Sequence, residues 1–232
     1  TEGEPMVTRR AEAFAHILRN IPIIIRDNEL IVGSSTIAPR GCQTFPEFSY
    51  QWLEDELDTV AGRSADPFFI KEETKEELRQ IHQYWKGWKG KTSSELATSY
   101  MDPEAIKAIE HNIFTPGNYF YNGVGHVTVK YEEVLAIGYE GIIAKAQKEL
   151  DECNVGDGDY AKKSRFLEAV IMSCQAVIDY AHRYAELAEQ MAYQCQDPTR
   201  KQELLQIASN CTHVPAKGAR NFYEACQSFW FV

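Results

Sequence analysis

Apolar residues recur along most of this chain at steps of three and four, the spacing of one face of an α-helix. The longest such stripe lies between Tyr160 and Tyr193. It is typical of a coiled coil, but the chain has no second heptad helix of similar length, so we expect it to pack inside a larger α/β body. The stripe consists of Phe166, Val170, Cys174, Val177, Ala181, Tyr184, Ala188 and Met191.

Periodicity and start signals predict further helices. Asp102-Pro103-Glu104 combines an N-cap carboxylate, a proline at the first helical position and an acid in the first turn. Asp197-Pro198 starts another helix in the same way. The predicted helices are 8–20, 50–60, 72–86, 102–112, one from Tyr131 with Val134, Leu135, Ile142, Ile143 and Ala146 inward, one from Asp197, and a last one marked by Phe222, Ala225, Cys226, Phe229 and Trp230.

Residues 22–33 break the helical pattern. Two short β-branched and aliphatic runs, 23–25 and 30–32, flank a polar Arg-Asp-Asn-Glu stretch, which predicts two short strands about a turn. Residues 34–48 contain Pro39, Gly41 and Pro46 and are expected to be irregular.

Composition narrows the class of protein. The chain has 232 residues, enough to bury a core, and a formal net charge of −10 without a basic stripe, which argues against a nucleic-acid surface. Its apolar runs fall far short of the roughly 18 residues that a membrane span needs. Its six cysteines form no Cys-x-x-Cys pair, which predicts reduced thiols in a cytoplasmic protein. The missing initial methionine and the apolar run 228–232 predict a piece of a larger protein.

Residues 117–126, between two predicted helices, are the leading candidate for chemistry. The stretch is glycine-rich, polar and aromatic, and it ends in His126. Glycines on both sides of Val124 allow a sharp turn or a close approach to a ligand, and Asn118 offers hydrogen bonds beside flat aromatic walls. Because histidine is the commonest acid–base group at neutral pH, the sequence predicts a small polar-substrate pocket with His126 in it.

Other candidate residues have simpler structural explanations. Gly90-Lys91-Thr92 lacks the glycine five residues earlier that a phosphate-binding loop requires. Cys211 and His213 have no second pair at zinc spacing. We expect core or surface roles for the histidines within predicted helices, His16, His82, His111 and His182.

Several short pieces of the chain are specific in their order and spacing, although none is decisive alone. They are Thr1-Glu2-Gly3, Arg9-Arg10-Ala11, residues 24–27, 29–33, 45–48 and 92–101, and Phe222-Tyr223-Glu224-Ala225-Cys226-Gln227. On these pieces the chain resembles, end to end, the N-terminal portion of a glycyl radical enzyme of the pyruvate formate-lyase-like family. The resemblance is closest to the cobalamin-independent glycerol and propane-1,2-diol dehydratases.

The resemblance implies a fold and a domain. Residues 1–232 would be the mainly α-helical N-terminal part of a pyruvate formate-lyase-like domain with a ten-stranded α/β barrel. In that family a glycyl radical, installed by a radical S-adenosylmethionine activating enzyme, passes to a mid-chain cysteine with a glutamate two residues on as base. No Gly-Cys-x-Glu pattern occurs here. We therefore expect this apparatus beyond Val232, no cofactor or metal bound by this segment, and no activity of the segment alone.

The resemblance also implies an activity, which is dehydration of glycerol to 3-hydroxypropionaldehyde or of propane-1,2-diol to propionaldehyde by a carbon-oxygen lyase. In the matching Gly-x-Gly-His run of the family the histidine contacts the substrate hydroxyls and protonates the one that leaves, a role we assign to His126. Asn118 matches a pocket-lining position that varies with substrate. Pro116 and Lys130 replace the valine and aspartate expected in the closest glycerol enzyme, which leaves the preferred diol open.

The implied partners are a small diol, the activating enzyme and a second copy in a homodimer, in the cytoplasm or in a bacterial microcompartment. Nucleic acid and membrane are not expected partners. One alternative is a relative of the choline lyase or hydroxyproline dehydratase type, which the pair Asn118 and His126 disfavours. The other is a helical binding module without chemistry.

Overall fold

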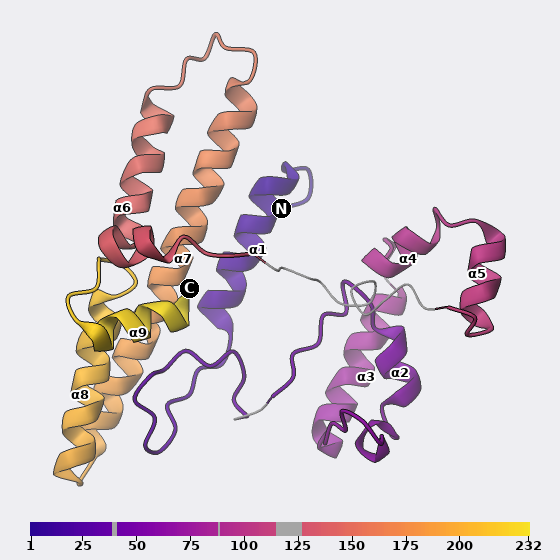
Figure 1. Ribbon diagram of the computed structural model, residues 1–232, viewed down its shortest axis with the longest axis horizontal. Helices are drawn as coiled ribbons and strands as arrows, with labels where there is room; N and C mark the ends of the chain where they lie inside the picture. Colours follow the sequence, from indigo (N-terminus) through magenta and orange to yellow (C-terminus); the bar gives the residue numbers. More distant parts are fainter. Residues whose placement is uncertain (39–40, 88, 115–126) are drawn as a thin grey trace. The chain divides into compact units, whose positions relative to one another are not determined.

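The computed structural model describes residues 1–38, 41–87, 89–114 and 127–232. These residues are helical and contain no β-strand (Figure 1). Residues 1–41 and 128–232 form one compact unit and residues 42–127 form another, and each unit has its own packing. No helix in the described ranges is both long and apolar enough to cross a membrane.

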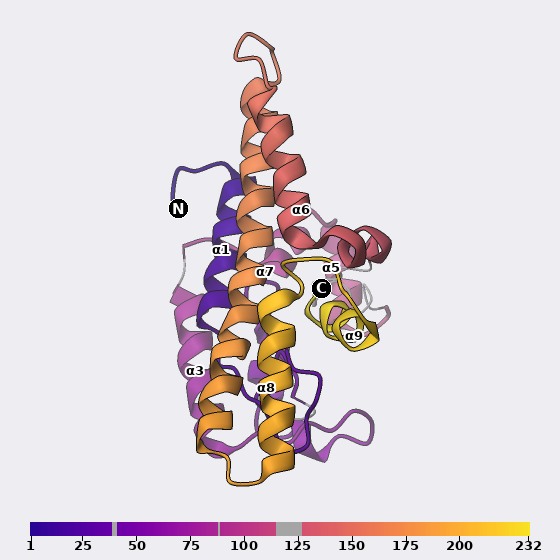
Figure 2. The same cartoon turned by 90° about the vertical axis from the view of Figure 1, so that its left-hand side faces the viewer.

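The first unit is built around α7 (Tyr160–Gln194), with α1 (Met6–Asn20), α6 (Tyr131–Asp151) and α8 (Pro198–His213) packed against it (Figures 1 and 2). A fifth helix, α9 (Phe222–Phe231), contacts α6 and α8. The centre of α7 is rich in alanine. Ala181, Ala188 and Ala192 are at most 1% exposed, and such small side chains let neighbouring helices approach closely.

The apolar stripe predicted for α7 is confirmed over its central part. Cys174, Val177, Ala181, Tyr184 and Ala188 are buried, and Val170 and Met191 are half-buried. Phe166 is the exception, with 57% of its surface exposed. The first turns of α7 bury Ser164 instead, and a residue two positions further on lies on nearly the opposite side of a helix.

Residues 21–34 do not form the two predicted strands, and that prediction was wrong. A hydrogen-bonded turn forms around Asp27 and Asn28, but side chains from distant helices, instead of a second strand, bind the backbone. Gln227 accepts from the Val32 N–H at 3.0 Å and donates to the Val32 carbonyl at 2.7 Å. Arg200 donates to the carbonyls of Arg26 and Glu29 at 3.0 Å each. The backbone of this segment is thus bound by side chains of α8 and α9.

The core of this unit joins segment 21–34 to α7 and α8. Val32, Tyr184 and Ile207 are completely buried within it, and Leu204 is 2% exposed. The hydroxyl of Tyr184 lies 3.4 Å from the carbonyl oxygen of Ser34, so this large polar side chain finds a partner in the core.

A kink divides α6 at Gly138, where φ is 64° and ψ is −179°. The predicted inner face is otherwise confirmed, with Val134 and Ala146 buried. The loop 214–221 between α8 and α9 lies against the kink, and a Cβ at Gly138 would stand 2.4 Å from the Ala216 carbonyl oxygen. Only glycine fits there, both sterically and in its backbone angles. Three backbone hydrogen bonds join the two segments, from Tyr139 to Pro215 at 2.8 Å, from Glu140 to Ala216 at 2.8 Å and from Ala219 to Leu135 at 2.9 Å.

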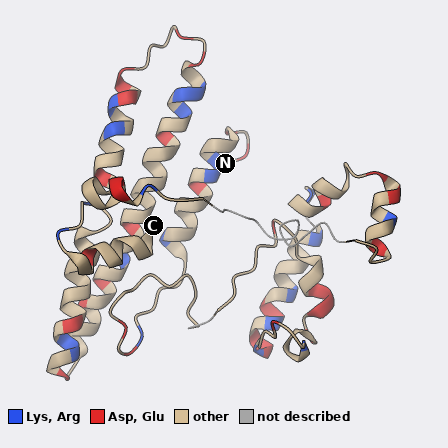
Figure 3. Cartoon of the chain, in the orientation of Figure 1, with Lys and Arg blue, Asp and Glu red and all other residues tan. Residues whose placement is uncertain are grey.

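The second unit contains α2 (Gln51–Glu56), a 3₁₀ turn η1 (Val60–Gly62), α3 (Glu72–Gly87), α4 (Ser93–Thr98) and α5 (Pro103–Glu110). The helix predicted over 50–60 is therefore divided into α2 and η1. Leu53, Leu57 and Leu78 form a small core between α2 and α3. The helix α3 carries both signs of charge, which pair as Lys75 with Glu72 and Arg79 with Glu76 (Figure 3). Asp102 caps α5 by accepting from the Glu104 N–H at 2.8 Å.

Candidate functional site

The two predicted site residues, Asn118 and His126, lie outside the described residues. The chain that follows them is described from residue 127, and α6 begins at Tyr131, so His126 precedes a helix start in the sequence as predicted. The residue before α6, Lys130, provides no side-chain cap. In the first turn the N–H groups of Tyr131 and Glu133 donate instead to the backbone carbonyls of Val129 and Lys130, at 2.9 and 3.0 Å.

The charges around the start of α6 are already balanced. Glu132 and Glu133 stand in the first turn, where carboxylates complement the positive end of the helix dipole. Glu133 lies 2.9 Å from the Lys130 ammonium and also contacts Lys145. Hydrogen bonds from Lys145 and then Lys130 lower the pKa of Glu133 to about 2, so it is ionised at neutral pH. The positive end of the α6 dipole is thus already compensated by the carboxylates of its own first turn.

The segment Gly90-Lys91-Thr92 leads into α4, a helix that was not predicted from the sequence, and Thr92 is its N-cap. The Thr92 side chain accepts from the Glu95 N–H at 3.3 Å, and the Glu95 carboxylate accepts from the Thr92 N–H at 2.8 Å. This reciprocal pair is a capping box. Its groups are bound to each other, which leaves no resemblance to a phosphate cradle.

Cys211 and His213 also have structural roles. Cys211 is 1% exposed, and burial raises the pKa of its thiol to about 12. The His213 Nε2 lies 3.0 Å from the Gly218 carbonyl oxygen, which ties the end of α8 to the following loop. Among the described residues no group of three or more His, Cys, Asp or Glu side chains could hold a metal ion.

Among the helical histidines that the structure describes, His82 alone is deeply buried. It is 2% exposed, its ring centroid lies 5.6 Å from that of Tyr50, and its Nδ1 has no hydrogen-bond partner. Burial lowers the pKa of His82, which favours the neutral ring. His16, His182 and His111 lie at the surface, and the Nδ1 of His111 stands 2.8 Å from the Lys107 carbonyl oxygen at the end of α5.

An open cavity of about 830 Å³ lies in the second unit, and no motif in the sequence indicates it. Its walls come from α2, α3, α4 and α5, so the residues that meet there are far apart in the chain. Aromatic, acidic and basic side chains share the lining, including Tyr50, Trp85, Lys86, Glu95 and Glu110. The Lys86 ammonium is already paired with Glu54 at 2.8 Å. This mixture does not single out one ligand chemistry.

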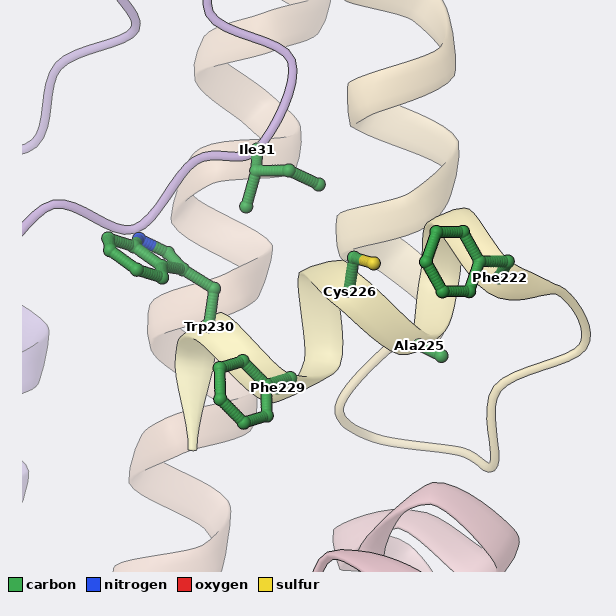
Figure 4. Close-up of a pocket in the computed structure, with 6 residues that line it drawn as sticks. All are labelled: Ile31, Phe222, Ala225, Cys226, Phe229 and Trp230. Atoms are coloured by element: carbon green, nitrogen blue, oxygen red, sulfur yellow. The ribbon is translucent and has the colours of Figure 1, made fainter.

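A second cavity, of about 610 Å³, lies along α9 (Figure 4). We call it the α9 groove. Ile31 reaches it from segment 21–34, and α9 supplies the rest of an entirely apolar lining, formed by Ile31, Phe222, Ala225, Cys226, Phe229 and Trp230. The predicted apolar side of the last helix is therefore the side that faces outward.

The inner side of α9 is polar, and two of its three buried polar residues are hydrogen-bonded there. The third is Ser228, whose hydroxyl has no hydrogen-bond partner among the described residues. Gln227 is completely buried and binds the backbone of Val32 on both edges. Glu224 is 1% exposed and accepts from the Arg220 N–H at 2.7 Å and from its Nε at 3.0 Å. Those hydrogen bonds from Arg220 are the main reason that the pKa of Glu224 is lowered.

The chain matches a family over its whole length. The model of the family described as Pyruvate formate lyase-like matches residues 1–232. The chain belongs to the pyruvate formate lyase-like family. Its relatives in this family are glycyl radical lyases and dehydratases, which confirms the resemblance predicted from the sequence.

Solved and curated relatives place the match more closely. A structure concerned with 1,2-propanediol dehydration in Roseburia inulinivorans is 63% identical with a TM-score of 0.91, covering 100% of this chain and 27% of that one. The glycerol-bound B12-independent glycerol dehydratase of Clostridium butyricum is 53% identical with a TM-score of 0.90, covering 100% and 29%. The (2S)-3-sulfopropanediol dehydratase of Klebsiella oxytoca is 33% identical, covering 100% and 28%.

Two facts follow from these matches. The chain spans less than a third of the length of the relatives that it matches. Its helical units share the fold of the corresponding segment of glycyl radical enzymes. The relatives act on different substrates, so membership of the family does not by itself determine the substrate.

Proposed function

We propose that residues 1–232 belong to a glycyl radical lyase that dehydrates a small diol, glycerol or propane-1,2-diol, to the corresponding aldehyde. The observation that carries this proposal is the difference in identity among the relatives. The chain is 63% and 53% identical to the two proteins concerned with propanediol and glycerol, and 33% identical to the sulfopropanediol enzyme. Enzymes of one family that share a substrate tend to share the residues that line its pocket. The higher identity to the propanediol and glycerol proteins therefore favours an uncharged diol as the substrate.

The described helices are the N-terminal part of the enzyme in this proposal, and a ten-stranded α/β barrel is supplied by the remainder. The share of the relatives that the chain covers, 27–29%, supports this division. The full-length enzyme is a cytoplasmic homodimer, free or packaged in a microcompartment, and its partner in activation is a radical S-adenosylmethionine enzyme.

The radical site does not fit onto this chain. None of its six cysteines is followed two residues later by glutamate. We assign the glycyl radical, which initiates hydrogen abstraction when it is installed, to the part of the enzyme beyond residue 232.

This chain contributes the acid of the reaction in our proposal. Hydroxide is a very poor leaving group, and a general acid beside the departing oxygen accelerates such a step by roughly 10²- to 10⁴-fold. His126 donates its proton to that oxygen as the C–O bond breaks and both bonding electrons stay on oxygen, so that water leaves. Asn118 hydrogen-bonds a substrate hydroxyl and holds the diol in register.

Turnover by the activated full-length enzyme tests the proposal. Aldehyde formation from glycerol and propane-1,2-diol would be compared with turnover of choline and trans-4-hydroxyproline under strict anaerobiosis. We expect product from at least one diol and none from the other two compounds. A protein that carries its radical, detected by electron paramagnetic resonance, and converts neither diol would refute the assignment.

A further inference from the structure

The start of α6, residues 131–137, is bent away from the rest of that helix. The bend is at Gly138, and the turns before it lie across the axis of the turns that follow (Figure 2). Glu133 precedes the bend and Lys145 follows it, yet their charged groups are in contact. In a straight helix twelve residues span about 18 Å, which is more than these two side chains bridge. The contact therefore depends on the bend.

Other elements of the same unit hold the bent start in place. The Ala219 N–H, in the loop between α8 and α9, donates to the Leu135 carbonyl at 2.9 Å. The ring centroid of Tyr131 lies 4.7 Å from that of Phe229 in α9. The first turns of α6 are thus attached to the unit at two points outside the helix.

Glu133 supplies a third attachment, from within α6. Its carboxylate lies 2.9 Å from the Lys130 ammonium and also contacts Lys145, so it joins the residue before the helix to the turns after the bend. A single exposed ion pair contributes little to stability. A carboxylate held by two ammonium groups from opposite sides of a bend nevertheless restrains the position of the backbone that carries them.

The position of these attachments in the sequence gives them a functional meaning. His126 stands five positions before Tyr131, and an extended chain covers at most about 3.6 Å per residue. Gly123 and Gly125 precede His126, and glycine restricts the backbone less than any other residue. The chain that follows His126 is therefore the side from which its position is set.

We infer that Glu133 is a positioning residue for the proposed reaction, which fixes the end of the stretch 117–126 by tying Lys130 to the body of α6. The inference rests on the proposed function, because that function makes His126 the acid. Glu133 takes no part in breaking the bond and acts through the four residues between His126 and α6. A displacement of about 1 Å in a reacting group costs up to about 10²-fold in rate, so a small loosening is measurable.

A simpler role for Glu133 is to complement the helix dipole, and Glu132 provides the matched control. Glu132 stands in the same turn and is exposed, and it bridges no two lysines among the described residues. Glu132→Gln and Glu133→Gln each remove one negative charge from the first turn and keep the size of the side chain. Only Glu133→Gln removes the ion pairs with Lys130 and Lys145.

The test measures diol turnover by the activated full-length enzyme, with the radical quantified by electron paramagnetic resonance. We expect Glu133→Gln to lower kcat about tenfold with KM changed less than about threefold, and Glu132→Gln to keep both within about twofold. Radical content and melting temperature should be the same in the two variants. In a His126→Gln background Glu133→Gln should lower the remaining rate less than about twofold, because the residue through which it acts is already absent.

Equal kcat for the two variants would overturn the inference. So would an equal loss from Glu133→Gln with and without His126, since Glu133 would then act on the structure as a whole. Hydrogen exchange of peptides covering residues 117–130, in the enzyme before activation, does not depend on the substrate. Glu133→Gln should speed this exchange at least about fivefold relative to Glu132→Gln, and equal exchange would overturn the inference. A wild-type enzyme that carries its radical and converts neither diol would refute the proposed function instead.

Discussion

Replacing Gln227 should loosen segment 21–34 more than any other single change on α9. Its side-chain amide binds both backbone groups of Val32. The Val32 N–H donates to the Gln227 Oε1 at 3.0 Å, and the Gln227 Nε2 donates to the Val32 carbonyl at 2.7 Å. Neither residue is exposed to solvent. In Gln227→Ala the two backbone groups therefore lose their partners while remaining buried.

The magnitude follows from these two losses. A buried polar group left without a partner costs about 1–3 kcal/mol, so two of them cost about 2–6 kcal/mol. Expressed as local opening, even the lower figure corresponds to a roughly 30-fold rise in the hydrogen-exchange rate of the Val32 amide. Gln227→Glu keeps an acceptor for the Val32 N–H, but when ionised it places a buried carboxylate against the Val32 carbonyl, so it should not restore the segment.

Hydrogen exchange with mass spectrometry on peptides that span residues 28–34 measures this effect in the full-length protein. Gln206→Ala is the matched control, because Gln206 is exposed and donates one hydrogen bond, to Asn210 at 2.8 Å. The control should change exchange in this segment by less than about twofold. If Gln227→Ala left the exchange of Val32 within about threefold of the wild-type rate, the amide bridge would not be what holds the segment.

Three further predictions concern other parts of the chain. Burial lowers the pKa of His82, so the unfolded chain takes up the proton first as the pH falls below about 6.5, and the stability of the folded chain should decrease from there downward. His82→Phe should remove this pH-dependent contribution, which thermal unfolding between about pH 5 and 8 measures. A pH slope of stability that is the same in His82→Phe would exclude the contribution. Gly138→Ala places a Cβ 2.4 Å from the Ala216 carbonyl oxygen on a residue with positive φ, and should lower the melting temperature markedly. Gly158→Ala, whose Cβ meets nothing within 4 Å, should leave the melting temperature unchanged. Equal melting temperatures of the two variants would contradict the steric argument. In the proposed full-length enzyme, His126→Ala should keep the glycyl radical but lose roughly 10²-fold or more of the diol turnover, and His126→Gln should recover binding better than rate. Asn118→Ala should lower kcat/KM about tenfold. Near-normal aldehyde formation by His126→Ala with a normal radical signal would exclude the acid role.

Most of the described helices could be predicted because their signals are local, although the short α4 was missed. Asp102-Pro103 and Asp197-Pro198 each place a capping carboxylate before a proline, and the structure begins α5 and α8 at those prolines. Segment 21–34 could not be predicted in the same way. Its aliphatic runs are typical of strands, but Val32 is bound by a residue 195 positions away, and no local pattern carries that information.

The α9 groove could be predicted only in part. The spacing of Phe222, Phe229 and Trp230 identifies one apolar side of a helix, which the structure confirms. The direction in which that side faces depends on the buried side chains of Gln227 and Glu224 finding hydrogen-bond partners, which periodicity does not encode. The site residues Asn118 and His126 stay predictions, because they rest on the resemblance and lie outside the described residues.

The loop 214–221 is joined to the kink of α6 in a way that constrains its number of residues more than the chemistry of its side chains. All three of its hydrogen bonds run between backbone atoms, so most side chains around them can be exchanged without removing one. A single inserted or deleted residue between 215 and 219 has a different consequence. It shifts the register and takes the donors and acceptors out of alignment together. Variation in this loop should therefore consist of substitutions, while Gly138, Gly218 and the number of residues stay fixed.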